Sequence, residues 1–208
     1  MKLRATILLT ALMACALLMQ ACSRPPAPQN SCEFVQNPDL QRVSWKGKLP
    51  VKLYVHNSVP TDAYAAIDKA VAEYNLHLGG GREIFKIIAR DVGGDLNPTK
   101  DGYSMIYWFD SWDPAKTNEQ ARTTIYWTGN EIFEADVRVN AKDFKYDFGD
   151  NLNSTEVDLE SLLVHEFGHV LGLQHNPTHG SVMNISLDVG QDRRTLGGVD
   201  VTNLKCEY

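Results

Sequence analysis

The sequence predicts one domain of the α+β class, on three observations. Several segments alternate apolar and polar residues with the two-residue period of strands, two longer segments repeat apolar residues at helical spacing, and turn-forming residues separate them. The chain has 208 residues, of which 43% are hydrophobic and 22% are charged. This is enough for one sizeable core with short appendages, so a single domain is expected.

The first elements expected in the domain are a strand and a covering helix. Val51 to Val55 alternates as a strand does, and Asn57 to Pro60 ends it. Thr61 or Asp62 is expected to cap the helix that follows, and Gly79 to Gly81 are expected to stop it. The apolar positions of this helix recur at steps of three and four and predict a stripe that covers a sheet: Ala63, Ile67, Ala70, Val71, Tyr74 and Leu78.

Four further strands are expected before a second long helix. They are Phe85 to Ala89, Ser104 to Phe109, Arg122 to Trp127 and Ile132 to Asn140. Thr155 and Asp158 are expected to form a capping pair at the start of that helix. Its inward face is expected to consist of Leu159, Leu163, Phe167, Val170 and Leu171. Asp200 to Cys206 is expected to form a short closing helix.

The segment from His165 to His175 has the residue spacing of a metal site. His165 and His169 are four residues apart, so both imidazoles project from one face of a helix. Glu166 is turned by about 100° from them, where a carboxylate can take a proton from water beside the metal. His175 lies too far along to share that face, so the chain must leave the helix, and Gly172 can adopt the positive φ that such a turn requires.

Three neutral imidazoles leave the fourth position of a tetrahedral zinc ion for water, which is typical of catalytic rather than structural zinc sites. Zinc lowers the pKa of its bound water to about 7 and polarises a carbonyl group. The expected cofactor is therefore one catalytic Zn²⁺ held by His165, His169 and His175. The expected reaction is hydrolysis of a peptide bond, with Glu166 as the general base and later as the proton donor to the leaving amine.

These residues resemble the signature of the metzincin metallopeptidases, H-E-x-x-H-x-x-G-x-x-H followed by a methionine-containing turn. Ser181 to Met183 would supply that turn, with Met183 packed beneath the metal and not bound to it. The order of elements is similar to that of the matrixin branch, the matrix metalloproteinases and their bacterial relatives, from about Leu49 to Tyr208. The resemblance implies a metzincin-like zinc endopeptidase: a twisted mixed sheet of about five strands with an antiparallel edge strand, a covering helix, a zinc-binding active-site helix and a C-terminal helix.

The same resemblance implies a place for the substrate. Thr123, Thr124, Ile125 and Tyr126 would lie on the antiparallel edge strand beside the cleft, where a peptide can add itself as another strand. The alternative is an ordinary half-buried strand. The residues after Met183, Asn184 to Ser186, depart from the tyrosine and proline usual in matrixins, which leaves the substrate preference open. Animal matrixins also carry structural zinc and calcium, and Ca²⁺ is left unassigned here.

The N-terminus has the pattern of an export signal. Lys2 and Arg4 precede an almost wholly apolar stretch, Ala5 to Ala21. A single-pass anchor is the alternative, but the stretch is at the short limit for spanning a bilayer, so cleavage is expected. Met19 to Cys22 resembles a bacterial lipoprotein box, which implies acylation of Cys22. Leu12 to Cys15 also fits that pattern, but cleavage there would leave an apolar run at the mature start.

The expected domain organisation is a signal peptide at residues 1–21, a lipidated N-terminus with a proline-containing linker at 22–31, and the peptidase domain at 32–208. The expected location is the bacterial cell envelope, lipid-anchored on the periplasmic side or at the cell surface. Cys32 and Cys206 remain near the two ends of the domain. A bridge between them is expected in an oxidising compartment, and two free thiols are the alternative.

The charge balance limits the expected partners. Removal of residues 1–21 takes away Lys2 and Arg4 and no acid, so the net charge of −6 becomes −8, which argues against binding of nucleic acid. The expected partners are a peptide or protein substrate and a membrane reached through the lipid on Cys22, with the protein itself a monomer. Two rival functions remain open: a catalytically inactive metzincin-like lipoprotein that binds a ligand, and a zinc amidase that acts on cell-wall peptides.

Overall fold

A computed structural model describes residues 29–78, 80–96, 100–150 and 153–208. The predicted signal peptide and the predicted lipidation site, Cys22, lie outside the described residues. Among the residues that are described, none of the helices is both long enough and apolar enough to cross a bilayer.

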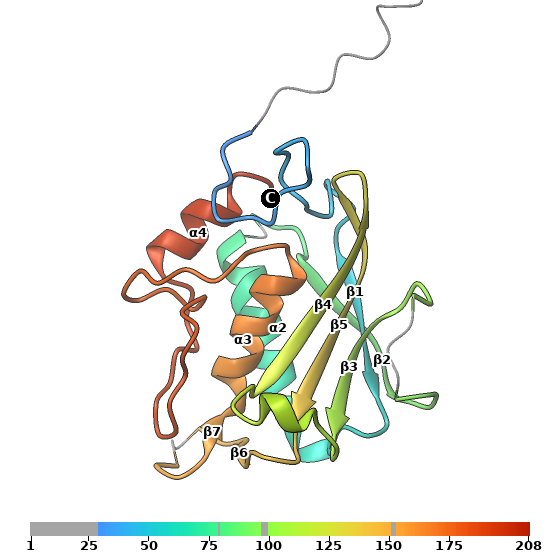
Figure 1. Cartoon of the computed structure of the whole chain (residues 1–208), viewed down its shortest axis with the longest axis vertical. Helices are drawn as coiled ribbons and strands as arrows, with labels where there is room; N and C mark the ends of the chain where they lie inside the picture. Colours follow the sequence, from blue (N-terminus) through green and yellow to red (C-terminus); the bar gives the residue numbers. More distant parts are fainter. Residues whose placement is uncertain (1–28, 79, 97–99, 151–152) are drawn as a thin grey trace, which may run out of the picture.

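Five strands form one sheet: β1 (Val51–His56), β2 (Phe85–Val92), β3 (Ser104–Phe109), β4 (Ala121–Thr128) and β5 (Glu131–Asn140). Their order is β2-β1-β3-β5-β4, and β4 is antiparallel to β5 whereas the other neighbours are parallel. Figure 1 shows β4 at the edge of the twisted sheet that lies nearest the helices. The structure thus confirms the predicted α+β class and the mixed sheet with an antiparallel edge strand, and β2 extends three residues beyond the predicted strand.

Two helices, α2 (Tyr64–Leu78) and α3 (Leu159–Val170), lie on the same side of the sheet (Figure 1). The Tyr74 hydroxyl of α2 donates to the backbone oxygen of Val164 in α3 at 2.7 Å, inside the core. Every residue of the predicted inward face of α3 is buried: Leu159, Leu163, Phe167, Val170 and Leu171. One helix therefore closes the core with one face and leaves the opposite face, with its histidines, for other contacts.

The predicted cap of the first helix is wrong. A short 3-10 turn, η2 (Thr61–Ala63), precedes α2, and the residue before it is Pro60, which makes no side-chain capping bond. Thr61 and Asp62 thus lie inside the first turn and not ahead of it. Pro60 starts the turn because its ring fixes φ near the helical value and because a missing N–H costs nothing at a helix start.

The predicted cap of α3 is also wrong, by three residues. The chain remains extended through β7 (Val157–Asp158), which pairs with β6 (Tyr146–Asp147), so the helix cannot begin until Leu159. Asp158 is then the N-cap, and its carboxylate accepts a bond from the Ser161 N–H at 2.7 Å. Thr155 instead bonds Asn153.

The closing helix α4 (Gly198–Leu204) is shifted by two residues from the predicted Asp200 to Cys206. Gly197 precedes it, and the buried Asp200 carboxylate accepts the Gly197 N–H at 2.9 Å, which sets the earlier start. After α4 the chain ends beside its own first described segment (Figure 1), and a disulfide joins Cys32 to Cys206 across 174 residues of sequence. The two ends of the described chain are thus covalently linked.

Candidate metal centre

The helix α3 carries the first two histidines and aims them by a bond at each ring. The Nδ1 atom of His165 lies 2.8 Å from the Val182 backbone oxygen, and the Nδ1 atom of His169 lies 2.7 Å from the Leu173 backbone oxygen. A carbonyl oxygen only accepts, so each Nδ1 carries the proton and each Nε2 keeps a free lone pair. Both rings are thereby held in the tautomer that binds metal through Nε2.

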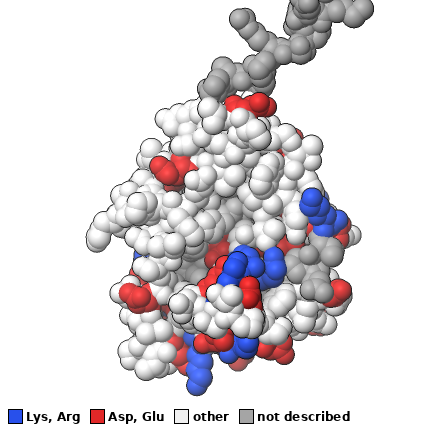
Figure 2. Space-filling model, viewed as in Figure 1, with Lys and Arg blue, Asp and Glu red and all other residues white. Residues whose placement is uncertain are grey.

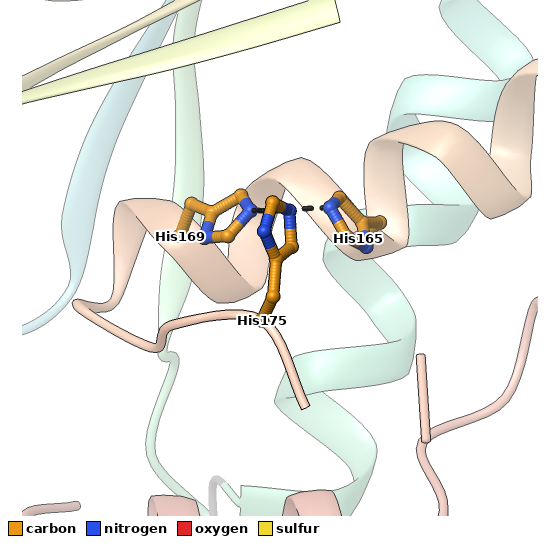
Figure 3. Close-up of side chains that lie close together, drawn as sticks. All are labelled: His165, His169 and His175. Carbon is orange, nitrogen blue, oxygen red and sulfur yellow. Dashed lines mark hydrogen bonds between the residues drawn. The ribbon is translucent and has the colours of Figure 1, made fainter. Parts of the chain in front are cut away.

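The third histidine arrives on the loop after α3, as predicted. The helix ends at Val170, and Gly172 then takes a φ of +102° that reverses the chain. A Cβ at this position would lie 2.3 Å from the Val43 backbone oxygen, so the turn has room only for glycine. His175 follows three residues later and points back at the helix (Figure 3).

The three Nε2 atoms converge. The Nε2 atom of His169 lies 3.1 Å from that of His165 and 3.2 Å from that of His175 (Figure 3). At zinc–nitrogen distances of 2.0 to 2.1 Å, a tetrahedral site has ligand–ligand edges of about 3.3 Å. Three acceptors facing one another at this spacing repel unless a cation or a proton lies between them, and the geometry fits a zinc ion.

Electrostatics favours the ligand form of all three rings. Burial lowers the pKa of His165 to about 3, and the neighbouring His169 adds to this effect. Burial also lowers the pKa of His169 and of His175. Neutral imidazole is the form that donates a lone pair to a metal, so a cation does not have to compete with protons here near neutral pH.

Glu166 is buried beside this cluster and is held by β4. The Thr123 hydroxyl donates to the Glu166 Oε2 atom at 2.5 Å, and it also lies 3.3 Å from the Glu166 backbone oxygen. Burial raises the pKa of Glu166 to about 7, although the bond from Thr123 acts in the opposite direction. A carboxyl group with a pKa near neutrality can both accept and return a proton.

A cavity of about 780 Å³ adjoins the three histidines and Glu166. It runs between β4 on one side and the segment Asn184 to Asp188 on the other. Figure 2 shows acidic and basic side chains intermixed over the lower part of the face in view. A cavity of this size that opens onto a metal site and a buried carboxyl group can hold part of a peptide.

The four residues predicted to bind substrate divide between the two faces of β4. Thr123 and Ile125 line the cavity. Thr124 instead accepts a bond from the Arg138 guanidinium at 2.7 Å, and the ring of Tyr126 lies under the ammonium group of Lys100. This division follows from the two-residue period of a strand. The side chains thus differ, but the backbone of all four residues lies on the free edge of the sheet.

Met183 is buried and lies directly against α3. A Cβ on Gly168 would be 2.2 Å from the Met183 Sδ atom, so the absence of a side chain at Gly168 creates the space for the sulfur. Gly168 stands next to His169 in the helix. The methionine therefore packs below the turn that carries the ligands, as the resemblance implies.

Sequence reasoning did not find the groups that orient the histidines. They are the carbonyls of Leu173 and Val182, and the Val182 N–H is itself held by the buried carboxylate of Asp200 at 2.9 Å. Every residue has a backbone carbonyl, so the sequence does not show which of them will accept these bonds. Asp200 offers only a weak signal, an acid within a short apolar helix. Thr123 was predicted, but as a substrate residue and not as the partner of Glu166.

Comparison with known proteins agrees with this geometry. The family model described as matrixin matches residues 104–208, which contain β3, β4, β5, α3, the three histidines and α4. Metalloendoproteinase 4-MMP of Arabidopsis thaliana is 37% identical over 68 residues, or 33% of this chain and 20% of that protein. Metalloendoproteinase 2-MMP of the same plant is 40% identical over 52 residues, or 25% of this chain and 14% of that protein. The matched stretches thus cover a small part of either relative.

Proposed function

This chain belongs to the matrixin family, and from that membership and the site geometry we propose that it is a zinc-dependent endopeptidase. The observation that carries the proposal is the convergence of three Nε2 atoms beside a buried glutamate. The Nε2 atom of His169 lies 3.1 Å from that of His165 and 3.2 Å from that of His175. His165, His169 and His175 would hold the ion. When bound, zinc supplies Lewis-acid activation of water and of the scissile carbonyl.

In this proposal Glu166 moves the proton. Thr123 engages its Oε2 atom, which leaves Oε1 as the oxygen that takes a proton from the attacking water and later gives it to the departing amine. Burial favours the protonated form, which makes Glu166 a better proton acceptor than an exposed carboxylate, and a pKa of about 7 still lets it give the proton up. Thr123 holds the carboxyl group in one rotamer, so no reorientation is needed between the two transfers.

The substrate is proposed to bind along β4. That strand pairs with β5 on one side and has no strand partner on the other among the described residues. An extended peptide that adds to this edge would pass directly over the cavity and the histidines. Replacing Thr124 by proline introduces a strand breaker into the edge, so peptide affinity should fall at least tenfold. Unchanged affinity in a variant with wild-type unfolding behaviour would remove this binding mode.

The activity is tested with purified protein and a mixed peptide library, with and without the zinc chelator 1,10-phenanthroline. Cleavage should require zinc. Glu166→Gln should lower kcat by about 10³ because it removes the base, while one equivalent of zinc stays bound. Glu83→Gln is the matched control, since that side chain is 54% exposed and pairs only with Lys86 on the surface.

The outcomes separate the peptidase from its rivals. A binding lipoprotein would hold zinc and cleave nothing. A cell-wall amidase would spare the library and release peptides from cell-wall fragments, again with loss in Glu166→Gln. Cleavage of the library by Glu166→Gln at the wild-type rate would contradict the mechanism.

We further propose that the protein is exported and anchored by lipid on Cys22 in a bacterial cell envelope. The supporting features are the charged and apolar N-terminal pattern, the lipoprotein-like Met19 to Cys22, and the disulfide between Cys32 and Cys206, a bond typical of oxidising compartments. Metabolic labelling with a fatty acid tests the anchor. Label should appear in the wild type and in Cys15→Ser and be absent in Cys22→Ser; label retained in Cys22→Ser would contradict the proposal.

A further inference from the structure

The end of α3 is held by residues that are very far away in the sequence. The last carbonyls of a helix lack partners inside the helix and need donors from elsewhere. Here three consecutive carbonyls receive them: Val170 from the Trp45 indole N–H at 2.9 Å, Leu171 from the Tyr208 hydroxyl at 2.6 Å, and Gly172 from the Val35 N–H at 2.9 Å. The donors come from the two ends of the described chain.

The loop that leads to His175 is fixed by the same segment. Phe34 and Leu173 form an antiparallel bridge, and the Gln174 N–H donates to the Glu33 backbone oxygen at 2.7 Å. Phe34 is fully buried in the core, so this bridge is anchored and not a surface contact. The backbone of the residue just before the third ligand is therefore set by Glu33.

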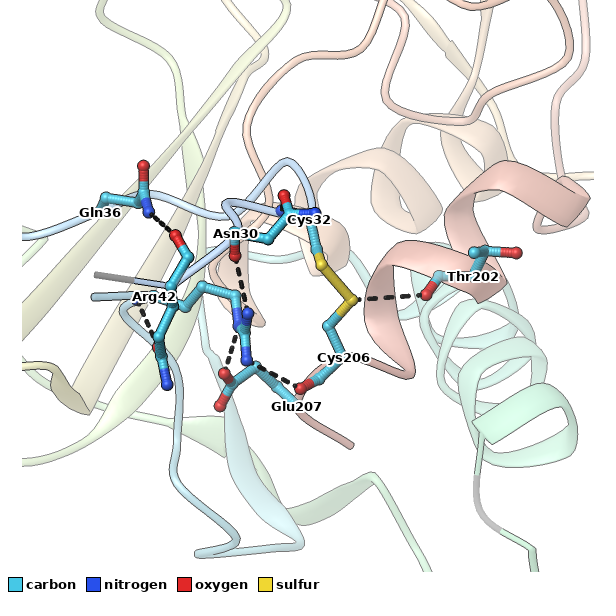
Figure 4. Close-up of a disulfide and its surroundings, with 8 residues drawn as sticks. Asn30, Cys32, Gln36, Arg42, Thr202, Cys206 and Glu207 are labelled. Atoms are coloured by element: carbon cyan, nitrogen blue, oxygen red, sulfur yellow. Dashed lines mark hydrogen bonds and ion pairs between the residues drawn. A yellow bond between two sulfur atoms is a disulfide. The ribbon is translucent and has the colours of Figure 1, made fainter. Parts of the chain in front are cut away.

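The two ends of the chain are in turn joined to each other. Cys32, next to Glu33, is bonded to Cys206, two residues before Tyr208 (Figure 4). Glu207 adds ion pairs with Arg42 at 2.5 Å and with Lys46 at 3.0 Å. We call this assembly the terminal brace: residues 32–35, Trp45 and residues 206–208.

We infer that the terminal brace positions His175, so that closure of the Cys32–Cys206 disulfide raises the affinity of the site for zinc; this inference rests on the proposed zinc function. The helix sets the backbone of His165 and His169 whether the brace is closed or open, although the carbonyl that orients the His169 ring belongs to Leu173, in the loop that the brace holds. His175 has no such support, because its loop depends on Glu33 and on the donors to the end of α3. A loop released from the brace must be ordered when the metal binds, and that entropy cost weakens binding.

The coupling is reciprocal by thermodynamic necessity. If the disulfide strengthens zinc binding by some factor, zinc opposes reduction of the disulfide by the same factor. Reduction by a dithiol such as dithiothreitol transfers two electrons and two protons to Cys32 and Cys206, which become thiols, while the reagent becomes a cyclic disulfide. A tenfold coupling therefore appears as a tenfold shift of this equilibrium, or about 30 mV for a two-electron couple.

The experiment measures the zinc dissociation constant of the full chain by competition with a chromophoric chelator, in buffer without substrate. Opening the brace with Cys32→Ser plus Cys206→Ser should weaken zinc binding at least tenfold. Trp45→Phe and Tyr208→Phe each remove one donor to the end of α3 and should weaken it several-fold. Trp127→Phe and Tyr103→Phe are matched controls, because those side chains are 42% and 51% exposed, and they should leave affinity unchanged.

A role confined to overall stability is excluded by repeating the measurement in His175→Ala. That variant retains the two helix-borne ligands and binds zinc weakly. If the brace acts mainly through His175, opening the disulfide in this background should weaken the remaining affinity much less than it does in the wild type. After correction for the zinc that dithiothreitol itself binds, the wild-type equilibrium should also show the tenfold shift when zinc is added, and that of His175→Ala should not.

Three results would overturn the inference: unchanged zinc affinity in a folded protein with an open disulfide, equal weakening in the His175→Ala background, or a dithiothreitol equilibrium indifferent to zinc. These outcomes are distinct from failure of the proposed function. A protein whose zinc affinity follows the disulfide but which cleaves no peptide would retain the brace and lose the peptidase. A folded, oxidised protein that binds no zinc would contradict both.

Discussion

The cavity beside the three histidines has two walls that are built in different ways. One wall is β4, whose residues pair with β5 along its length. The other, which we call the loop wall, is residues 184–193, where the described chain contains neither strand nor helix. The first wall is therefore positioned by a ladder of backbone hydrogen bonds, whereas the second has few backbone bonds, such as that from the Gly190 N–H to the Glu156 oxygen at 3.2 Å, and depends more on side chains.

Few side chains hold the loop wall. They make these bonds: Arg193 to the carbonyls of Ser181, Asn184 and Ser186, and Gln120 to the carbonyl of Leu187. Just before the wall, the buried carboxylate of Asp200 accepts the Ser181 hydroxyl at 2.5 Å and the Val182 N–H at 2.9 Å. Val182 is the residue whose carbonyl orients His165. The same contacts thus support the loop wall and the metal site.

This difference between the two walls predicts where single substitutions should have local effects and where their effects should spread. In β4 a side-chain change leaves the ladder intact, so it should alter chemistry at one point. In the loop wall the removal of one charged group leaves several backbone donors or acceptors without partners. The consequences there should be larger and should spread to the histidines.

The largest effect is expected for Asp200→Ala. This removes the acceptor of three bonds inside the core, from the Ser181 hydroxyl and from the N–H groups of Val182 and Gly197. Buried donors without partners are costly, so the free energy of unfolding should fall by about 3 kcal/mol. Urea unfolding measures this, and zinc affinity should fall as well because Val182 orients His165. Asp39→Ala, at an exposed residue outside both walls, is the control, and an equal loss in the two variants would contradict the comparison.

The next largest effect is expected for a substitution in β4, the wall that is a strand. Thr123→Val keeps the shape of the side chain and removes the bond to the Glu166 carboxyl group. A hydrogen bond to a charged group contributes about 1.5 to 3 kcal/mol, so kcat should fall by about tenfold to a hundredfold. KM and zinc content should stay as in the wild type, and the free energy of unfolding should fall by about 1 kcal/mol, less than for Asp200→Ala, because one buried carboxyl group loses one partner while the ladder with β5 is untouched. A fall in stability as large as the fall in kcat would show that this wall, too, depends on its side chains.

The two walls also differ in how far the sequence predicts them. The alternation from Arg122 to Asn140 is local, so it predicts both strands and their pairing within a residue or two, whereas the edge position of the first strand is implied by the resemblance. The spacing of His165 and His169, with Gly172 after them, is local too, and it gave the helix, the turn and the loop-borne ligand. Such features follow from the periods of helix and strand and from the steric freedom of glycine.

The remaining features depend on contacts between distant residues, which no local pattern encodes. Thr155 and Asp158 have the spacing of a capping pair, but pairing of β7 with β6 keeps the chain extended and moves the helix start to Leu159. Likewise, no local sequence pattern around Arg193 predicts that its guanidinium bonds three carbonyls of an irregular segment. The bonds from Trp45 and Tyr208 to the end of α3 are of the same kind.

A third test concerns the charge of the loop wall. Arg193 lines the cavity, and burial lowers its pKa without taking the charge away near neutral pH. It forms no ion pair within the part of the chain that the structure describes. Such a cation should favour substrate side chains that carry a carboxylate next to the scissile bond.

Arg193→Gln should therefore lower kcat/KM for peptides with an acidic residue there about tenfold, or about 1.4 kcal/mol, relative to peptides with the matching amide. The measurement is kcat/KM for paired Glu and Gln peptides. Lys116→Gln, at an exposed residue that lines the mouth of the same cavity, should change that ratio much less. An unchanged ratio in Arg193→Gln would mean that the guanidinium serves only the loop backbone.

The smallest expected effect is on the pH dependence of stability, at the point where the loop wall ends. Arg194 follows Arg193 and pairs with Asp158, the N-cap of α3. Burial by itself opposes the charged form of Asp158, but the bonds from Arg194 and from Ser161 outweigh it and lower the pKa of the carboxyl group below its usual value. A lowered pKa in the folded state means that the charged carboxylate stabilises the fold above about pH 4, the value for an unfolded aspartate, and that this contribution is lost as the pH falls further.

Asp158→Asn keeps a capping oxygen but removes the charge that pairs with Arg194, so it should cost about 1 kcal/mol at pH 6 and progressively less toward pH 3, where the wild type loses the same charge. Denaturant unfolding of both proteins across this range measures the difference, with Asp39→Asn as the exposed control. A gap between wild type and variant that stays constant with pH would mean that the cap acts through geometry alone. A gap that closes in acid would show that the charge on Asp158, at the start of α3, is what holds Arg194 and the end of the loop wall.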